Sequence, residues 1–219
     1  MKRTFTLIPT LALVLILAGC TTSNPPTPTS HTTSVATGGA AARAADTWAP
    51  GSSWVYRYES PRGSGTFEWV VDREEQLDGV KFYVVAAGPR EIYFRKSDLA
   101  LYMEKMHGTV EVRMNPPIRL ASGVSGDKWE LRYVREAPQQ QAQNVLRKCA
   151  TTGPEKITVP AGTFDTTKTT CVDVKTGETV YEAWYAAAAK QLARERSRFS
   201  KGDGWREREL IGMRLFTDR

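Results

Sequence analysis

The stretch FEWVVDREEQLDGVKFYVV, residues 67–85, decides the fold because it holds two strand signals around one turn. Aromatic and β-branched residues dominate both ends of the stretch, and such residues favour extended strands. Between them stands Asp78-Gly79, a dipeptide typical of a two-residue hairpin turn. The stretch therefore predicts a hairpin of two antiparallel strands.

Strand signals of the same kind recur on both sides of this hairpin. They cover residues 54–58, 91–95, 109–114, 128–134, 144–149, 156–159, 164–174, 179–185 and 206–215. Pro116-Pro117 is expected to end a strand, because proline has no N–H to donate to a neighbouring strand. Short aromatic strands separated by turns are typical of mostly β domains. We expect a single antiparallel curved sheet, forming an open barrel or a sandwich, with little helix outside the signal segment.

The stretch EAWYAAAAKQLARERSRF, residues 182–199, carries conflicting signals. Alanine, lysine, glutamine, leucine and arginine are strong helix formers. A helix, however, would place Arg194 four residues from both Lys190 and Arg198, and like charges at that spacing are unfavourable. The choice between helix and strand therefore stays open over residues 186–198. We favour a strand from Leu192 onwards, with a helical turn before it.

One sequence pattern occurs twice in the chain. GSSWVYRY at residues 51–58 and GDKWELRY at residues 126–133 both follow the pattern Gly-x-x-Trp-x-x-Arg-Tyr. A turn glycine followed by a strand with an early tryptophan would anchor the core twice, in two related halves. Chance similarity between two aromatic strands is the alternative.

The N-terminus has the features of a bacterial secretory signal. Lys2 and Arg3 precede an apolar run of about a dozen residues, which is shorter than the roughly 20 residues of a membrane-spanning helix. The run ends in Leu17-Ala18-Gly19-Cys20, which resembles the lipobox of bacterial lipoproteins. This resemblance implies cleavage of a signal peptide over residues 1–19 and fatty acylation of Cys20, with palmitate as a typical acyl group. An ordinary cleaved signal followed by an unrelated cysteine is the alternative.

The segment after the signal is expected to tether a domain to the membrane. Residues 20–47 are rich in Pro, Thr, Ser, Gly and Ala, a composition that buries too little apolar surface to fold. Position 21 is Thr, whereas aspartate there commonly retains lipoproteins of enteric bacteria at the inner membrane. We therefore expect an anchor in the outer membrane, facing the periplasm. Residues 48–219 have the length of one domain.

Cysteine content fits an oxidising compartment. With Cys20 acylated, Cys149 and Cys171 remain as an even pair, and we predict a disulfide between them.

The net charge of +6 falls to +4 when Lys2 and Arg3 are removed with the signal. Residues 190–219 hold nine Lys or Arg against five Asp or Glu, so the excess of four positive charges belongs to the C-terminal segment.

The run VPAGTF, residues 159–164, resembles the V-P-A-G-x-F turn of the TapB-like family, a group of exported bacterial proteins of unknown function. In that family a strand, a Trp-Tyr pair and two further strands follow the turn, and Trp184-Tyr185 occupies the matching position here. Ala187 stands where the family usually has proline. The resemblance implies a curved antiparallel sheet. It brings no catalytic residues to this chain.

No residue pattern identifies an active site. His107 is the only histidine after the tether, and it stands beside a glycine in a predicted loop. We expect neither a metal nor another cofactor, because no cluster of His, Cys, Asp or Glu has metal-ligand spacing. The leading hypothesis is a non-catalytic binding or assembly module of the cell envelope. An envelope hydrolase acting on glycan or peptide is one alternative, and a half-barrel carrier of lipid or lipoprotein is another.

The expected partners follow from the anchor and from the aromatic sheet. The membrane is one partner, through Cys20, and an envelope protein, a glycan or an apolar ligand is a second. Nucleic acid is not expected outside the cytoplasm. Trp205 follows a glycine-containing turn, and with Arg206 and Arg208 it forms the predicted contact for a partner. The glutamates interleaved with these arginines favour instead a strand laced with salt bridges.

Overall fold

The computed structural model describes residues 47–198 and 204–217, which form twelve strands and one short helix. The strands are β1 (Ser53–Ser60), β2 (Gly63–Leu77), β3 (Val80–Ala87), β4 (Arg90–Arg95), β5 (Leu101–Met106), β6 (Thr109–Ile118), β7 (Lys128–Glu136), β8 (Gln143–Val159), β9 (Gly162–Asp173), β10 (Thr179–Ala186), β11 (Gln191–Arg198) and β12 (Trp205–Arg214). The predicted signal peptide, Cys20 and the tether up to residue 46 lie outside the described residues.

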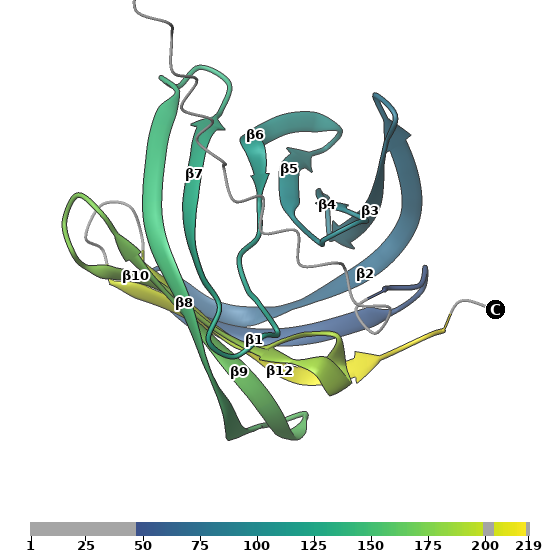
Figure 1. Cartoon of the computed structure of the whole chain (residues 1–219). Coiled ribbons are helices and arrows are strands. Elements are labelled where there is room, and N and C mark those ends of the chain that lie inside the picture. Colours follow the sequence, from purple (N-terminus) through teal and green to yellow (C-terminus); the bar gives the residue numbers. More distant parts are fainter. Residues whose placement is uncertain (1–46, 199–203, 218–219) are drawn as a thin grey trace, which may run out of the picture. The chain divides into compact units, whose positions relative to one another are not determined.

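The twelve strands form one closed antiparallel barrel (Figure 1). Each strand pairs with its neighbours in the chain, and β1 pairs with β12 to close the ring. The predicted mostly β, antiparallel fold with little helix is confirmed. The described residues contain no helix long and apolar enough to cross a membrane.

Every second side chain of a strand points into the barrel, and these side chains fill its interior. Trp54 and Tyr56 on β1 are fully buried, whereas Val55 between them is only partly buried and the next residue, Arg57, is exposed. Aromatic rings bury large apolar areas, and their burial stabilises the closed ring. The predicted hairpin turn at Asp78-Gly79 is confirmed: both residues have positive φ, and Leu77 pairs with Val80 across the turn.

Two strands, β5 and β8, differ from the sequence prediction. The sequence LYMEKM of β5 was not predicted as a strand, because only its alternate residues Leu101 and Met103 are buried and its other residues have weak strand preference. The two strands predicted over residues 144–159 are one strand, β8, with a bulge between Thr152 and Glu155. Bulges allow a strand to continue past residues that interrupt its pairing.

Pro116-Pro117 does not end β6 but lies in an irregular part of it. The pairing of β6 with β5 jumps from Ile118 opposite Leu101 to Arg113 opposite Met103, so the prolines fall between these two pairs. Because the regular pairing of β5 with β6 is interrupted there, the two prolines do not have to donate an N–H to the sheet.

The conflict over residues 186–198 resolves into a short helix and a strand. The 3₁₀ helix η2 (Ala187–Ala189) turns the chain, Lys190 follows with a left-handed φ of 51°, and β11 begins at Gln191. The predicted strand from Leu192 is confirmed to residue 198, and residue 199 lies outside the described residues. Pairing with β10 and β12 outweighs the helix preference of the alanines and arginines.

The repeated Gly-x-x-Trp pattern marks structurally equivalent turns. The N–H of Gly51 donates to the carbonyl of Val71 over 2.7 Å, and the N–H of Val71 donates back to Ser52 over 2.8 Å. Gly126 and Asp127 exchange the same two bonds with Thr151, each over 2.8 Å. These turns lead into β1 and β7, which stand six strands apart in the ring of twelve. The two halves of the ring, β1–β6 and β7–β12, therefore begin with the same turn.

Substitution of the two turn glycines should have equal effects. Gly51 and Gly126 have φ of 89° and 85°, which L-residues rarely adopt. Gly51→Ala and Gly126→Ala should each lower the free energy of unfolding by about 1–2 kcal/mol, measured by urea denaturation. Gly126→Asn should cost less, because asparagine tolerates left-handed backbone. Equal stability of the Ala and wild-type proteins would contradict this assignment.

Candidate functional site

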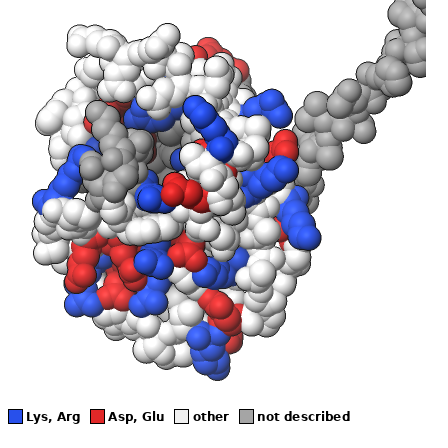
Figure 2. All heavy atoms as spheres, turned by 90° about the vertical axis from the view of Figure 1, so that its left-hand side faces the viewer, with Lys and Arg blue, Asp and Glu red and all other residues white. Residues whose placement is uncertain are grey.

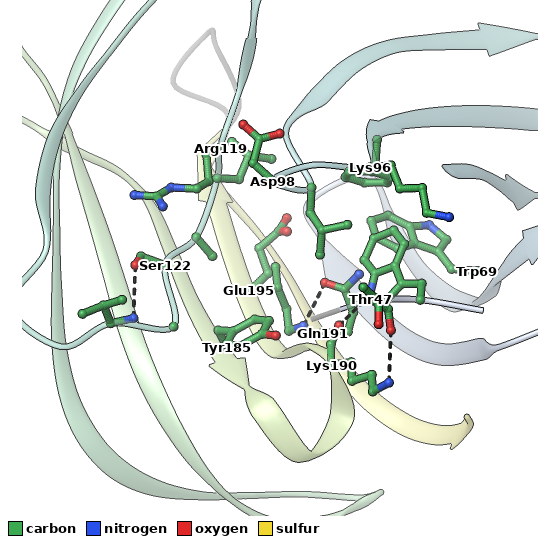
Figure 3. A pocket seen from close by; sticks show the side chains of 18 of the residues that line it. Thr47, Trp69, Lys96, Asp98, Arg119, Ser122, Tyr185, Lys190, Gln191 and Glu195 are labelled. Atoms are coloured by element: carbon green, nitrogen blue, oxygen red, sulfur yellow. Dashed lines mark hydrogen bonds between the residues drawn. The ribbon is translucent and has the colours of Figure 1, made fainter. Parts of the chain in front are cut away.

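A cavity of about 130 Å³ lies inside the barrel, between elements from both halves (Figure 3). The segments that precede β1 and β7, the β4–β5 loop and the turn from η2 into β11 surround it. Figure 3 shows Lys190 and Thr47 joined by a hydrogen bond on one side of this space, with Ser122 on the other. Its large apolar lining side chains are Trp48, Trp69, Phe94, Leu99, Leu120, Tyr185 and Leu192. Its charged lining side chains are Lys96, Asp98, Arg119, Lys190, Glu195 and Arg208.

Trp48 forms one wall of the cavity and is held on several sides. Its Nε1 donates to the carbonyl of Lys190 over 2.8 Å. Its ring centroid lies 5.2 Å from those of both Trp54 and Phe94. Because its polar atom is bonded and its ring is packed, Trp48 is a fixed part of the wall.

The segment before β7 is tied down on the opposite side by Ser122. The N–H of Ser122 donates to Oγ1 of Thr169 over 3.3 Å, and its carbonyl accepts from Oγ1 of Thr167 over 2.8 Å. The hydroxyl of Ser122 also bonds the carboxylate of Asp127. The cavity is therefore preformed by segments that the sheet holds in place.

A buried ion pair, Glu195 with Arg208, forms part of the cavity lining. Nη2 of Arg208 lies 2.5 Å from Oε2 of Glu195, and both side chains are at most 7 % exposed. Glu195 also accepts from the hydroxyl of Tyr181 over 3.3 Å and lies 3.4 Å from Nη2 of Arg206. One carboxylate thus serves two guanidinium groups and one phenol.

Aromatic rings surround the guanidinium of Arg208. Its Cζ lies 4.3 Å from the ring centroid of Trp69 and 4.8 Å from that of Tyr56. Such cation–π contacts stabilise a buried guanidinium. Burial by itself lowers the pKa of Arg208, but the negative charge of Glu195 offsets this and holds the pKa above its ordinary value. Arg208 therefore stays charged inside the barrel.

The two phenols near this pair stay neutral. Burial raises the pKa of Tyr56 and of Tyr181 above their usual range, although the positive charge of Arg208 opposes the shift. The hydroxyl of Tyr56 donates to the carbonyl of Leu192 over 3.0 Å. Both groups therefore serve as hydrogen-bond donors in a fixed position.

The three residues predicted to contact a partner differ in how far they are exposed. Arg206 is exposed and Trp205 is half-buried beneath the guanidinium of Arg196, 5.0 Å from the ring centroid. Arg208 is buried and lines the cavity instead. A surface contact therefore stays a prediction for Trp205 and Arg206 alone.

The predicted salt-bridged strand is present on the outside of β11 and β12. Glu207 bridges Arg194 and Arg196 over 3.4 and 3.2 Å, and Glu209 lies 3.4 Å from Arg194. Figure 2 shows acidic and basic side chains interleaved over the face that it presents. Paired charges of this kind contribute little to stability and leave little free positive charge for an anionic surface.

The two cysteines of the domain form the predicted disulfide. Cys149 on β8 and Cys171 on β9 stand directly opposite each other, their Cα atoms 4.1 Å apart, and both are buried.

His107 is exposed in the turn between β5 and β6 with a positive φ of 50°. The described residues contain no group of three or more potential metal ligands.

Sequence reasoning missed the Glu195–Arg208 pair, although a signal for it exists. Arg208 stands two residues before Leu210, and alternate residues of a strand share one face. Since Leu210 belongs to the core, Arg208 had to face inwards as well. The partner Glu195 becomes visible only once β11 is known to be a strand beside β12.

Comparison with known proteins finds distant structural neighbours only. No protein-family model and no curated protein matches the sequence. Among solved structures, a predicted lipoprotein of Parabacteroides distasonis is 14% identical with a TM-score of 0.35, over 77% of this chain and 97% of its own. An exported protein of Bacteroides fragilis with a YmcC-like fold is 15% identical with a TM-score of 0.37, over the same shares of the two chains. The hypothetical lipoprotein YmcC of Escherichia coli is 11% identical with a TM-score of 0.42, over 73% of this chain and 83% of its own.

Proposed function

We propose that this protein is a non-catalytic binding module of the bacterial cell envelope, anchored through Cys20 in the outer membrane and facing the periplasm. The observation that carries the binding function is the cavity inside the barrel, with its aromatic wall and its few convergent polar groups. Apolar pockets with a small number of fixed polar groups are the usual form of ligand sites. The lipobox-like sequence before Cys20 supports the anchor.

The carboxylates that line the cavity favour binding over hydrolysis. Asp98 holds Arg95 through both of its oxygens, over 2.8 and 2.6 Å. Glu195 is shared by Arg206 and Arg208. A glycosidase needs one carboxyl group that carries a proton to the leaving group, and pairing with arginine opposes that protonation.

The volume of the cavity also weighs against the carrier alternative. A half-barrel carrier would need a deep apolar groove, whereas this sheet is closed and its cavity measures about 130 Å³. Sites for drug-sized ligands measure about 300–1,000 Å³. The cavity therefore suits a small molecule.

A substitution that fills the cavity tests the binding function. Ala121 lines the cavity, whereas Ala188 is exposed on η2. When the acylated full chain is purified from envelopes and extracted for mass spectrometry, wild type and Ala188→Trp should release a small molecule. Ala121→Trp should release at least tenfold less, because the indole occupies the ligand's space. Equal recovery from both tryptophan variants would refute the proposal.

The anchor is tested separately by metabolic labelling. Cells given a clickable palmitate analogue should label the full chain, and Cys20→Ser should abolish the label completely, because the acceptor sulfur is gone. Ser23→Ala, three residues further on, should leave the labelling unchanged. Labelling that persists in Cys20→Ser would place the lipid elsewhere.

A further inference from the structure

The charged side chains that line the cavity already have partners within the protein. Five of the six are held in ion pairs: Lys96 with Glu74, Asp98 with Arg95, Arg119 with Asp127, and Glu195 with Arg208. The sixth, Lys190, donates from Nζ to the carbonyl of Thr47 over 3.0 Å, at an exposed position. A charged ligand would lose its water without finding a free counter-ion here, and that loss is costly. The cavity therefore favours an uncharged ligand.

One polar group of the lining keeps a donor that the described residues do not use. Gln191 lines the cavity and is only 7% exposed. Its Oε1 accepts from the N–H of Leu192 over 2.9 Å. Since a backbone N–H can bond only the oxygen of the amide, this contact fixes the orientation of the side chain. Nε2 of Gln191 makes no hydrogen bond to the described residues.

This amide differs from the buried side-chain nitrogens that nothing can reach. The Nε atoms of Arg113, Arg147 and Arg208 have no partner and are covered by the protein, whereas Nε2 of Gln191 is not among the covered atoms. Figure 3 shows Gln191 among the lining side chains, near the centre of the view. An amide donor in a mostly buried place gains from an acceptor that a ligand brings.

The size and the walls of the cavity limit the apolar part of the ligand. A cavity of about 150 Å³ lined by aliphatic and aromatic side chains accommodates one benzene molecule. The present cavity of about 130 Å³ is of that order. Phe94 contacts two other lining rings, with centroids 5.2 Å from Trp48 and 5.9 Å from Trp69. These three rings form a continuous aromatic wall, against which an apolar group the size of one ring can pack.

We propose that the cavity binds a small uncharged carbonyl compound, such as a ketone, an ester or an amide. Its oxygen accepts from Nε2 of Gln191, and its apolar part, the size of one ring, packs against the aromatic wall. The bond uses the idle donor and leaves the contact between Gln191 and Leu192 in place. This inference rests on the proposed binding function and names the ligand class of the same cavity.

Calorimetric titration of the acylated full chain in non-ionic detergent tests the ligand class. Acetophenone, ethylbenzene, benzoate and benzylamine share one ring and differ in the acceptor and in charge. Affinities refer to the free probe, with titration into detergent alone as the blank. Acetophenone should bind about fivefold more tightly than ethylbenzene, because one hydrogen bond is added. Benzoate and benzylamine should each bind about tenfold more weakly than acetophenone, because their charges stay uncompensated.

Two variants of Gln191 locate the carbonyl. Gln191→Met keeps the length of the side chain but has no donor, and it should lower the affinity for acetophenone to that for ethylbenzene. Gln191→Glu keeps the acceptor for the N–H of Leu192 and exchanges the amine for a carboxylate oxygen, so it should abolish the same preference. Thermal melting checks that each variant is folded. Gln76→Met, at an exposed position of β2, is the matched control and should keep the fivefold preference.

The possible failures are distinguishable. Equal affinity of the wild type for acetophenone and ethylbenzene would overturn the acceptor argument, and tighter binding of benzoate or benzylamine would overturn the charge argument. If no probe binds while Ala121→Trp still removes the native small molecule, the ligand class is wrong and the binding function stands. If the probes bind Ala121→Trp as tightly as wild type, they bind outside the cavity and this inference falls, while recovery of the native molecule still decides the binding function.

Discussion

Glu195→Leu is expected to lower the free energy of unfolding by about 3–5 kcal/mol, because it leaves Arg208 charged and buried without its counter-ion. Glu195 supplies the one carboxylate within ion-pair distance of Arg208 among the described residues. Arginine keeps its proton at neutral pH in proteins, so loss of the proton does not relieve the buried charge in the variant. Urea denaturation at neutral pH measures the effect.

The double variant Glu195→Leu/Arg208→Met separates the cost of a lone charge from the value of the pair. Replacing both partners by apolar residues often leaves stability unchanged or raises it. The double variant should therefore regain most of the stability that Glu195→Leu loses. Glu68→Leu, at an exposed position of β2, is the control and should change stability by less than about 0.5 kcal/mol. A double variant as unstable as the single one would show that the pair itself stabilises the barrel.

Removal of the disulfide should cost about 3 kcal/mol. The bridge closes a loop of 22 residues between β8 and β9, and a loop of that length gains about 3 kcal/mol on the chain-entropy model. Cys149→Ala/Cys171→Ala should shift the urea midpoint accordingly. Reductant should destabilise the wild type to a similar extent.

The double-alanine variant provides the control for that experiment. Reductant should have no effect on it, because it has no bridge to lose. If the exported wild type reacts with two equivalents of an alkylating agent at Cys149 and Cys171 without prior reduction, the bridge does not form in the cell.

Much of the fold could be predicted from local sequence. Asp78-Gly79 and the alternating aromatics of β1 specify their hairpin and strand by local chemistry alone. The strand β5 was not predicted from the sequence, because its methionines, lysine and glutamate have little intrinsic strand preference. Pairing with β4 and β6 holds it in the sheet. Closure of the ring depends on the pairing of β1 with β12, between residues more than 140 positions apart, which no local pattern reveals.

The candidate site was harder to predict than the fold. Its parts come from segments spread between Thr47 and Arg208, and none of them carries a recognisable motif. The basic residues of β12 were expected on the surface because a charged side chain is usually solvated. Arg208 breaks that expectation because Glu195 and the ring of Trp69 replace the water it loses.

The ring of twelve strands also restricts how other proteins can approach this one. Each strand of the described sheet already has a neighbour on both sides, including β1 and β12. An exposed strand edge is the template on which extended peptides add to a sheet and on which β-rich proteins polymerise. Any protein partner must therefore recognise side chains or turns, and a high local concentration should not drive this domain to stack edge to edge.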